Sequence, residues 1–383
     1  MTGSALAKNK IDKIELFRYD SDVERHFSFG TWKSRQHAFI EITSGDYCGW
    51  GENVMSVNNK NISLSEWGQY FHELNGLSIL EAIQYIERKL TDWGSRRCEM
   101  ADMALLDLAG HIIGEPAGKL LELNWDEVKN SVPGVYVILH DDPTQVKELA
   151  KKAINEKLTT HVKLKLFGKI ELDIELVRAI RDVLGEEPYI IGDVNCGYRE
   201  KLADEGMHDI ANQLIKLHAN GLNACEDPAM LTNAQWVELQ NMTGGLDLIP
   251  DYPLRLAVTA IKTILPGMGR IYNIHPGCTG SIHGAVKLGK KIKEIGGKLM
   301  IGDDSLLGPA NTAWQQIAIG LGADWVEALV KPGESDGFLN SVKAQATVRM
   351  DGSAITVPKL LPGFGLEIDE DLLRHASWSN FVF

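Results

Sequence analysis

Eight short apolar runs decide the fold: VYVIL (135–139), HVKLKL (161–166), PYIIGD (188–193), LNACED (222–227), LDLIPD (246–251), RIYNIH (270–275), KLMIGD (298–303) and ADWVEA (323–328). After each run come a polar turn and a helix-like stretch. The polar residues that end seven of the runs lie 24 to 33 residues apart. A (β/α)8 barrel uses about 30 residues per unit, so this spacing predicts a TIM-like barrel of parallel strands.

The segment before these runs predicts a small α+β unit. Strand patterns occupy residues 14–19, 37–42 and 47–53. Between the first two strands, the polar and aromatic segment 20–35 is expected to be a loop. From residue 63 to 114 the apolar period changes to that of helices.

The segment after the runs is expected to return to that first unit. Here Asp351-Gly352 stands between two strand-like stretches and favours a hairpin turn. We therefore expect an α/β fold in which an α+β capping domain, formed by the N-terminal region and the C-terminal tail, covers the barrel. The expected boundaries are 1–130 for the cap, 131–335 for the barrel and 336–383 for the tail.

Composition and charge narrow the class of protein. The 383 residues are 44% hydrophobic and 24% charged, which is typical of a globular chain. The net charge of −13 would repel nucleic acid and anionic membranes, so neither is an expected partner. The five cysteines form no CxxC pair, and no apolar stretch is long enough for a signal or a membrane span. We expect a cytoplasmic protein.

Three carboxylates follow consecutive predicted strands. Asp193, Glu226 and Asp251 end the third, fourth and fifth runs, so they should meet at the barrel mouth, where barrel enzymes place their catalytic groups. Clustered carboxylates repel one another unless a cation lies among them, and an all-oxygen set suits Mg²⁺, with Mn²⁺ as a substitute. Taken singly, each acid could instead cap a helix, as Asp303 and Asp304 could.

Two lysines share one face of the second predicted strand. Lys163 and Lys165 alternate with Val162, Leu164 and Leu166. Because helices cover the outside of a barrel, the lysines should point inward, although a solvated edge strand would show the same alternation. The positive charge of Lys163 would favour the neutral form of Lys165, which could then act as a base.

A histidine ends the sixth predicted strand. His275 would lie across the mouth from Lys165 and could exchange a proton near neutral pH, or it could be an ordinary loop histidine before Pro276-Gly277. Asp303 is a candidate to hold its ring, and Glu327 is a candidate either to orient the substrate or to pair with a lysine. Three acids and two lysines sum to −1, and one divalent ion makes this +1, so the mouth should attract a carboxylate.

These residues resemble the enolase superfamily, from its muconate lactonizing enzyme and mandelate racemase branches. The resemblance covers nearly the whole chain, and its motifs are GWGE (49–52), ALLDLAGHIIGEPAGKLL (104–121), KLK (163–165), GDVNCGY (192–198), EDP (226–228) and PGFGLEID (362–369). The set of KxK with three acids at strand ends is specific, whereas GWGE alone would be weak.

The resemblance implies a role for each site residue. Asp193, Glu226 and Asp251 look like Mg²⁺ ligands, and Lys165 looks like the base, assisted by Lys163. Segment 20–35 resembles the loop that covers the substrate. The candidates for substrate binding are Arg25, His26, Trp32, Asn195, Asp303 and Glu327.

Two departures leave the reaction open. The lactonizing branch carries a lysine on the sixth strand where this chain has His275. In the racemase branch an Asp on the sixth strand supports a His on the seventh, which is the reverse of His275 and Asp303.

The resemblance implies an Mg²⁺-dependent enzyme that takes the α-proton of a small carboxylate to give an enediolate. We expect a racemase, epimerase or cycloisomerase; a dehydratase of a hydroxy acid or sugar acid is the alternative, and a non-catalytic barrel is a third. A homo-oligomer is also expected.

Overall fold

The fold is that of a computed structural model, which describes residues 2–123, 131–327, 329, 336–349 and 352–383. It is an α/β structure with separate parallel and antiparallel sheets. The expected domain boundaries border segments 124–130 and 330–335, which lie outside the described residues. Within the described residues, every helix is too short or too polar to cross a lipid bilayer.

All eight apolar runs form parallel strands. Five make one sheet in the order β5-β6-β7-β8-β9 and three make another in the order β10-β11-β12. Their bounds are β5 Tyr136–Ile138, β6 His161–Lys165, β7 Tyr189–Asp193, β8 Ala224–Glu226, β9 Asp247–Ile249, β10 Ile271–Ile274, β11 Lys298–Ile301 and β12 Trp325–Val326.

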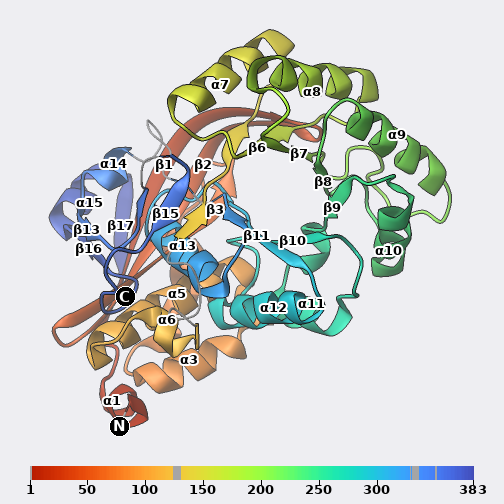
Figure 1. The fold of residues 1–383 in the computed structure, drawn as a ribbon. Helices are drawn as coiled ribbons and strands as arrows, with labels where there is room; N and C mark the ends of the chain where they lie inside the picture. Colours follow the sequence, from red (N-terminus) through yellow and green to blue (C-terminus); the bar gives the residue numbers. More distant parts are fainter. Residues whose placement is uncertain (1, 124–130, 328, 330–335, 350–351) are drawn as a thin grey trace.

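Helices follow the strands in alternation and lie outside them, so that the strands stand in a ring (Figure 1). These helices are α7 Pro143–Asn155, α8 Ile170–Leu184, α9 Met207–Ala219, α10 Asn233–Met242, η2 Tyr252–Leu254, α11 Ala257–Thr263, α12 Ile282–Glu294 and α13 Pro309–Leu321.

Main-chain hydrogen bonds join the edges of the two parallel sheets. Asn273 N donates to Pro250 O at 3.1 Å, which connects β10 to the residue after β9. Val135 N donates to Val326 O at 3.0 Å, which connects β12 to the residue before β5. Main-chain hydrogen bonds therefore connect the two parallel sheets to each other at both of their junctions.

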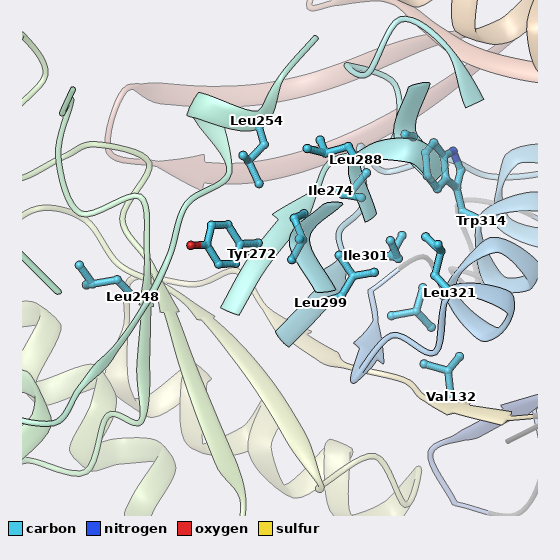
Figure 2. Close-up of a cluster of buried hydrophobic side chains, with 14 of the residues drawn as sticks. Val132, Leu248, Leu254, Tyr272, Ile274, Leu288, Leu299, Ile301, Trp314 and Leu321 are labelled. Atoms are coloured by element: carbon cyan, nitrogen blue, oxygen red, sulfur yellow. The ribbon is translucent and has the colours of Figure 1, made fainter. Parts of the chain in front are cut away.

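Apolar side chains on the outside of the strands hold the helices. Figure 2 shows Ile274, Leu299 and Ile301 from β10 and β11 beside Leu288 of α12 and Leu321 of α13. A smaller cluster inside the ring fills the space far from the mouth: Val135, Ile191, Ala224, Ile249, Ile271, Met300 and Trp325. Burial on both faces explains why these strands read as apolar runs.

The antiparallel cap sheet joins both ends of the chain, in the order β17-β1-β2-β3. Its strands are β1 Lys13–Phe27, β2 Gly30–Ser44, β3 Tyr47–Val57 and β17 Ser379–Val382. The helices of the N-terminal region are α1 Thr2–Lys8, α2 Leu64–Gly68, η1 Gln69–Leu74, α3 Ile79–Glu87, α4 Leu90–Trp93, α5 Ser95–Ile113 and α6 Ala117–Leu120.

The expectation of a loop over residues 20–35 is wrong. β1 and β2 continue through this segment as one long hairpin, paired from Lys13–Thr43 out to Phe27–Gly30 with an irregularity near Asp22. The segment lacks the regular alternation of a half-buried strand. It is nevertheless a strand pair, because main-chain hydrogen bonds join its two halves and aromatic rings pack together at its tip.

The GWGE motif acts in packing. A Cβ at Gly49 would lie 2.2 Å from Ala104 O, and one at Gly51 would lie 2.2 Å from Met100 O. Both oxygens belong to α5, so only glycine lets β3 approach the backbone of this helix.

The tail forms two small sheets and a short helix before β17. β14 (Val348–Arg349) pairs with β15 (Ala354–Thr356), as the predicted hairpin requires, and β15 pairs with β4 (Ser131–Pro133). The turn residues 350–351 lie outside the described part. The remaining elements are α14 Asp336–Leu339, β13 Val342–Gln345, β16 Leu366–Ile368 and α15 Glu370–Ala376.

Three carboxylates join the tail to the cap sheet. Oxygen atoms of Glu15, Glu41 and Glu370 lie within 4.8 Å of one another. The Lys13 ammonium is 3.3 Å from Glu15, 3.3 Å from Glu41 and 3.9 Å from Glu370, and Arg374 contacts Glu15 and Glu370, so two basic side chains offset part of the negative charge. Burial, and after it the Glu370 carboxylate, raises the pKa of Glu41 to about 7.

We expect Glu41→Gln to raise the unfolding temperature by a few degrees near pH 8 and to change it little near pH 5. Folding raises the pKa of Glu41, so its stabilising contribution is complete below the unfolded value of 4.5 and is lost as the pH rises through about 7. Thermal unfolding followed by circular dichroism checks this, with exposed Glu238→Gln as the control. The same shift at both pH values would contradict it.

Candidate active site

The three predicted metal ligands lie where three neighbouring strands end. Asp193 is the last residue of β7, Glu226 is the last of β8, and Asp251 comes two residues after β9. All three are buried, with relative exposures of 3%, 1% and 1%. Parallel pairing sets Asp193 directly opposite Glu226, so their side chains leave the ring at one depth.

The ammonium of Lys163 lies at the centre of the site. Its Nζ is 2.9 Å from Glu327 Oε2, 3.0 Å from Glu226 Oε2 and 3.3 Å from Asp193 Oδ2. Burial lowers the pKa of Lys163, but Glu226, Glu327 and Asp193 outweigh it and hold the pKa well above its usual value. Lys163 is therefore a fixed cation among carboxylates.

Lys165 points into the same space. Its Nζ donates to Asp193 Oδ2 at 2.7 Å and lies 4.8 Å from the centre of the Phe27 ring. Val162 and Leu164, which alternate with the two lysines, pack in the outer core. The inward direction predicted for both lysines is confirmed.

Charges of the site shift its acids in opposite directions. Burial alone would raise the pKa of Asp193, but Lys165 and Lys163 hold it well below its usual range. For Glu226, burial dominates, Lys163 opposes it, and nearby carboxylates add to the rise, so its pKa is about 8.

Asp251 has a basic partner of its own. Burial raises its pKa, but His275 and then Arg255 lower it below the usual value, and Arg255 Nη2 lies 2.8 Å from Asp251 Oδ2. Asp227 accepts hydrogen bonds from Asp251 N and Tyr252 N, each at 3.1 Å, and so shapes the turn that carries Asp251. Burial, followed by the charge of Asp251, raises the pKa of Asp227 to about 7.

The donor set fits a hard divalent cation. Asp193, Glu226 and Asp251 offer only oxygen, and Glu226 Oε2 makes an ion contact with Lys163 but accepts no hydrogen bond of good geometry within the described residues. The buried Asn195 Oδ1 likewise has no hydrogen-bond partner there. The three acids do not meet as a set within 4.8 Å in the described structure, where Lys163 stands between Asp193 and Glu226.

His275 follows β10 on the other side of the mouth. Its Nε2 lies 3.9 Å from Asp251 Oδ2, and its Nδ1 lies 2.9 Å from Pro276 O. Burial lowers the pKa of His275, but the Asp251 carboxylate outweighs it and raises the pKa to about 10.

Two acids after β11 have different roles. Asp303 Oδ1 accepts a hydrogen bond from Leu306 N at 3.0 Å, the turn-capping role that the sequence left open. Asp304 is buried between Arg35 (2.9 Å) and Arg96 (2.8 Å), which hold its pKa well below its usual range, and His275 lowers it further. Of the two acids after β11, Asp304 is therefore the one whose pKa responds to His275, whereas Asp251 is the acid that most raises the pKa of His275 itself.

The other predicted binding residues are brought together in part. Glu327 pairs with Lys163, and Asn195 N donates to Asp193 Oδ1 at 3.1 Å. Arg25 and Trp32 line the cavity, where Arg25 Nη1 donates to Ser305 Oγ.

His26 is not among the residues of the cavity wall. Its Nδ1 contacts Thr31 Oγ1 at 3.1 Å, across the hairpin, instead.

One cavity of about 990 Å³ contains this chemistry. Its wall includes residues that the sequence did not predict as individual site residues: Phe27, Arg35, Arg96, Asp227, Arg255, Cys278 and Asp304. Only two had a local signal, Asp227 as the neighbour of Glu226 and Asp304 as the neighbour of Asp303. The others reach the cavity through long-range packing.

Carboxylates of the cap hold the loops of the mouth. Glu99 of α5 accepts hydrogen bonds from Gly277 N (2.6 Å), Thr279 N (2.8 Å) and Gly280 N (3.3 Å), in the loop after His275. Glu52 of the GWGE motif accepts hydrogen bonds from the main chain at the start of α13: Leu307 N (2.6 Å), Gly308 N (2.8 Å) and Ala310 N (3.3 Å).

Comparison with known proteins agrees with this arrangement. The sequence model of the family described as "Enolase C-terminal domain-like" matches residues 145–372, more than half of the chain. The chain therefore belongs to this family, as a member of the enolase superfamily similar to muconate lactonizing enzyme and mandelate racemase, and it is an enzyme.

Two relatives in sequence are isomerases by name. N-succinyl-L-Arg/Lys racemase of Bacillus cereus is 22% identical over 383 residues, covering 95% of this chain and 97% of the relative. L-Ala-D/L-Glu epimerase of Clostridium acetobutylicum is 25% identical over 201 residues, covering 52% of this chain and 53% of the relative.

Solved structures share the fold. Dipeptide epimerase from Cytophaga hutchinsonii, complexed with Mg and the dipeptide D-Ala-L-Val, has a TM-score of 0.80 at 18% identity, over 97% of this chain and 99% of the other. Muconate lactonizing enzyme from Pseudomonas fluorescens, complexed with muconolactone, has a TM-score of 0.79 at 19% identity, over 96% and 99%.

We expect Glu99→Ala to lower the unfolding temperature by several degrees, because it leaves buried main-chain donors of the loop after His275 without an acceptor. Each orphaned donor costs about 1–3 kcal/mol. Glu99→Gln keeps one acceptor oxygen and should lose less. Thermal unfolding of both variants checks this, and an unchanged midpoint for Glu99→Ala would contradict it.

Proposed function

We propose that the protein is an Mg²⁺-dependent isomerase that removes and returns the α-proton of a small carboxylate, as a racemase, epimerase or cycloisomerase does. The observation that carries this proposal is the buried amine of Lys165, 2.7 Å from a carboxylate of a three-acid set, at the mouth of a ring of parallel strands. The names of the related racemase and epimerases support an isomerase.

The architecture that we propose is a closed (β/α)8 barrel over residues 131–335 with a cap formed by 1–130 and 336–383. The hydrogen bonds at both sheet edges support closure of the ring. The pairing of β17 with β1 supports a cap that both chain ends build.

Asp193, Glu226 and Asp251 would hold Mg²⁺, or Mn²⁺ in its place. When bound, a divalent ion polarises a substrate carboxylate and stabilises the enediolate that forms when the α-proton leaves. Lys163 would orient the acids, because its ammonium already contacts Asp193 and Glu226, and it helps to keep Asp193 ionised. The structures of two dipeptide epimerases with Mg support this choice of metal.

Lys165 would move the proton on one face of the α-carbon. Its Nζ is held in place by Asp193 and by the face of the Phe27 ring. β6 and β10 are the second and sixth of the eight strands, so His275 stands across the ring from Lys165. Its Nε2 would give or take the proton on the opposite face.

The second candidate function is a dehydratase. A histidine at the end of β10, in place of a second lysine, favours this alternative because an imidazolium can protonate a departing β-hydroxyl. Both reactions share the removal of the α-proton by Lys165 and differ in the product, which is a 2-keto acid for the dehydratase. The homo-oligomer stays a prediction.

We expect Mg²⁺ to raise the unfolding temperature of the wild-type protein and to have little effect on Asp193→Asn. A ligand at about 100 times its Kd stabilises a fold by about 2.7 kcal/mol, and the variant removes an anionic ligand. Exposed Asp209→Asn should respond to Mg²⁺ as the wild type does. If Mg²⁺ stabilised all three proteins equally, these acids would not be the site.

We expect Lys165→Ala to slow exchange of the substrate α-proton by about 100- to 10,000-fold, the usual contribution of a positioned base. Incubation in D₂O with N-acylated amino acids, dipeptides and hydroxy acids, read by mass spectrometry, measures this. Exposed Lys262→Ala is the control.

Turnover without deuterium at the α-carbon would overturn the proposal. A 2-keto acid trapped with semicarbazide would select the dehydratase.

A further inference from the structure

Arg255 is the basic partner of the third acid of the site, and the proposed reaction does not use it. Its Nη2 donates to Asp251 Oδ2 at 2.8 Å, and its Nε donates to Asp251 Oδ1 at 3.3 Å. The guanidinium therefore engages both oxygens of a carboxylate that is only 1% exposed. Contacts of this two-point kind are among the strong hydrogen-bonded ion pairs of proteins, and they fix the orientation of the carboxylate.

The ion pair of Asp251 differs from those of the other two acids. Asp193 meets lysine ammonium groups at Oδ2, and Glu226 meets one at Oε2. At Asp251, in contrast, the guanidinium faces both oxygens. Two cations at one buried carboxylate repel each other strongly. A divalent cation bound to Asp251 and the contact of Arg255 with the same oxygens therefore oppose each other.

The side chain of Arg255 has room to leave Asp251. It is 34% exposed and forms part of the wall of the cavity of about 990 Å³. Its guanidinium lies 5.7 Å from the centre of the Tyr252 ring, which belongs to the same wall. The main chain is held separately, because Arg255 N donates to Tyr252 O at 3.2 Å at the end of η2. The guanidinium can thus move into the cavity while its backbone stays in place.

We infer that Arg255 competes with the divalent cation for Asp251. In the ion pair, the guanidinium neutralises Asp251 and fixes it. A cation that binds Asp251 takes over both roles and releases the guanidinium into the cavity. Arg255 therefore weakens the affinity of the site for the cation. The inference rests on the proposed function, because that function makes Asp251 a ligand of the cation.

Calorimetric titration of the full-length protein with Mg²⁺ tests the competition. We expect Arg255→Gln to bind Mg²⁺ at least about tenfold more tightly than the wild type, which is about 1.4 kcal/mol. Arg270→Gln is the matched control, since Arg270 forms an ion pair with Asp247 at the same distance of 2.8 Å, at the end of the ring far from the mouth. This control should bind Mg²⁺ as the wild type does.

If Arg255→Gln fails to fold, Arg255→Lys decides. Lysine keeps the positive charge but lacks the planar fork that engages both oxygens. This variant should also bind Mg²⁺ more tightly than the wild type.

Chemical labelling of the wild-type protein follows the guanidinium itself and needs no variant. Phenylglyoxal reacts with accessible guanidinium groups, and peptide mass spectrometry gives the rate at each arginine. We expect saturating Mg²⁺ to raise the labelling rate of Arg255 several-fold and to leave that of Arg270 unchanged.

The outcomes separate the competition from the proposed function. If the folded Arg255 variants bind Mg²⁺ no more tightly than the wild type, or if Mg²⁺ does not raise the labelling of Arg255, the competition is overturned and the metal site stands. If neither the wild type nor the variants bind Mg²⁺, both the competition and the proposed function are overturned.

Discussion

The contact of Lys163 with three carboxylates is the interaction on which the active site depends. The Lys163 ammonium lies within 3.3 Å of Asp193, Glu226 and Glu327, which lie at or just after the ends of three different strands. Without this cation the acids would repel one another in a buried space, where removing one partner of an ion pair typically costs about 3–5 kcal/mol. Lys163 therefore holds the carboxylates together and lowers the pKa of Asp193, although burial still raises the pKa of Glu226 to about 8.

The active site also requires the N-terminal region, because carboxylates of this region hold the loops around the site in place. Glu99 and Asp102 of α5 bind main-chain donors from the loop after His275 to the start of α12, and Glu52 of β3 does the same at the start of α13. Carboxylates at helix N-termini are stabilised by the exposed amides there. These contacts therefore help to fix where the loops that carry His275 and Asp304 lie.

Most of the fold was predictable from period and spacing. Most of the parallel strands are buried on both faces, so they appear as apolar runs, and seven of the eight runs end near a polar residue such as Lys165, Asp193 or Glu226. The outer half of the β1–β2 hairpin was not predictable, because it is polar. Its two strands pair with each other there, so its sequence lacks the apolar pattern of strands that pack on a core. The sequence also did not indicate that Phe27, at the tip of this hairpin, packs against Lys165.

The sequence by itself determined the kind of strand, the order of the acids along the ring and the inward direction of Lys163 and Lys165, since alternation and strand ends are local properties. Tertiary structure alone decided which charges meet. Arg35 and Arg96 reach Asp304 across more than 200 residues of chain, and nothing in the neighbourhood of any one of them encodes the other two. The reason is that ion pairs in a buried mouth depend on how two packed units approach each other, and that approach is a property of the whole core.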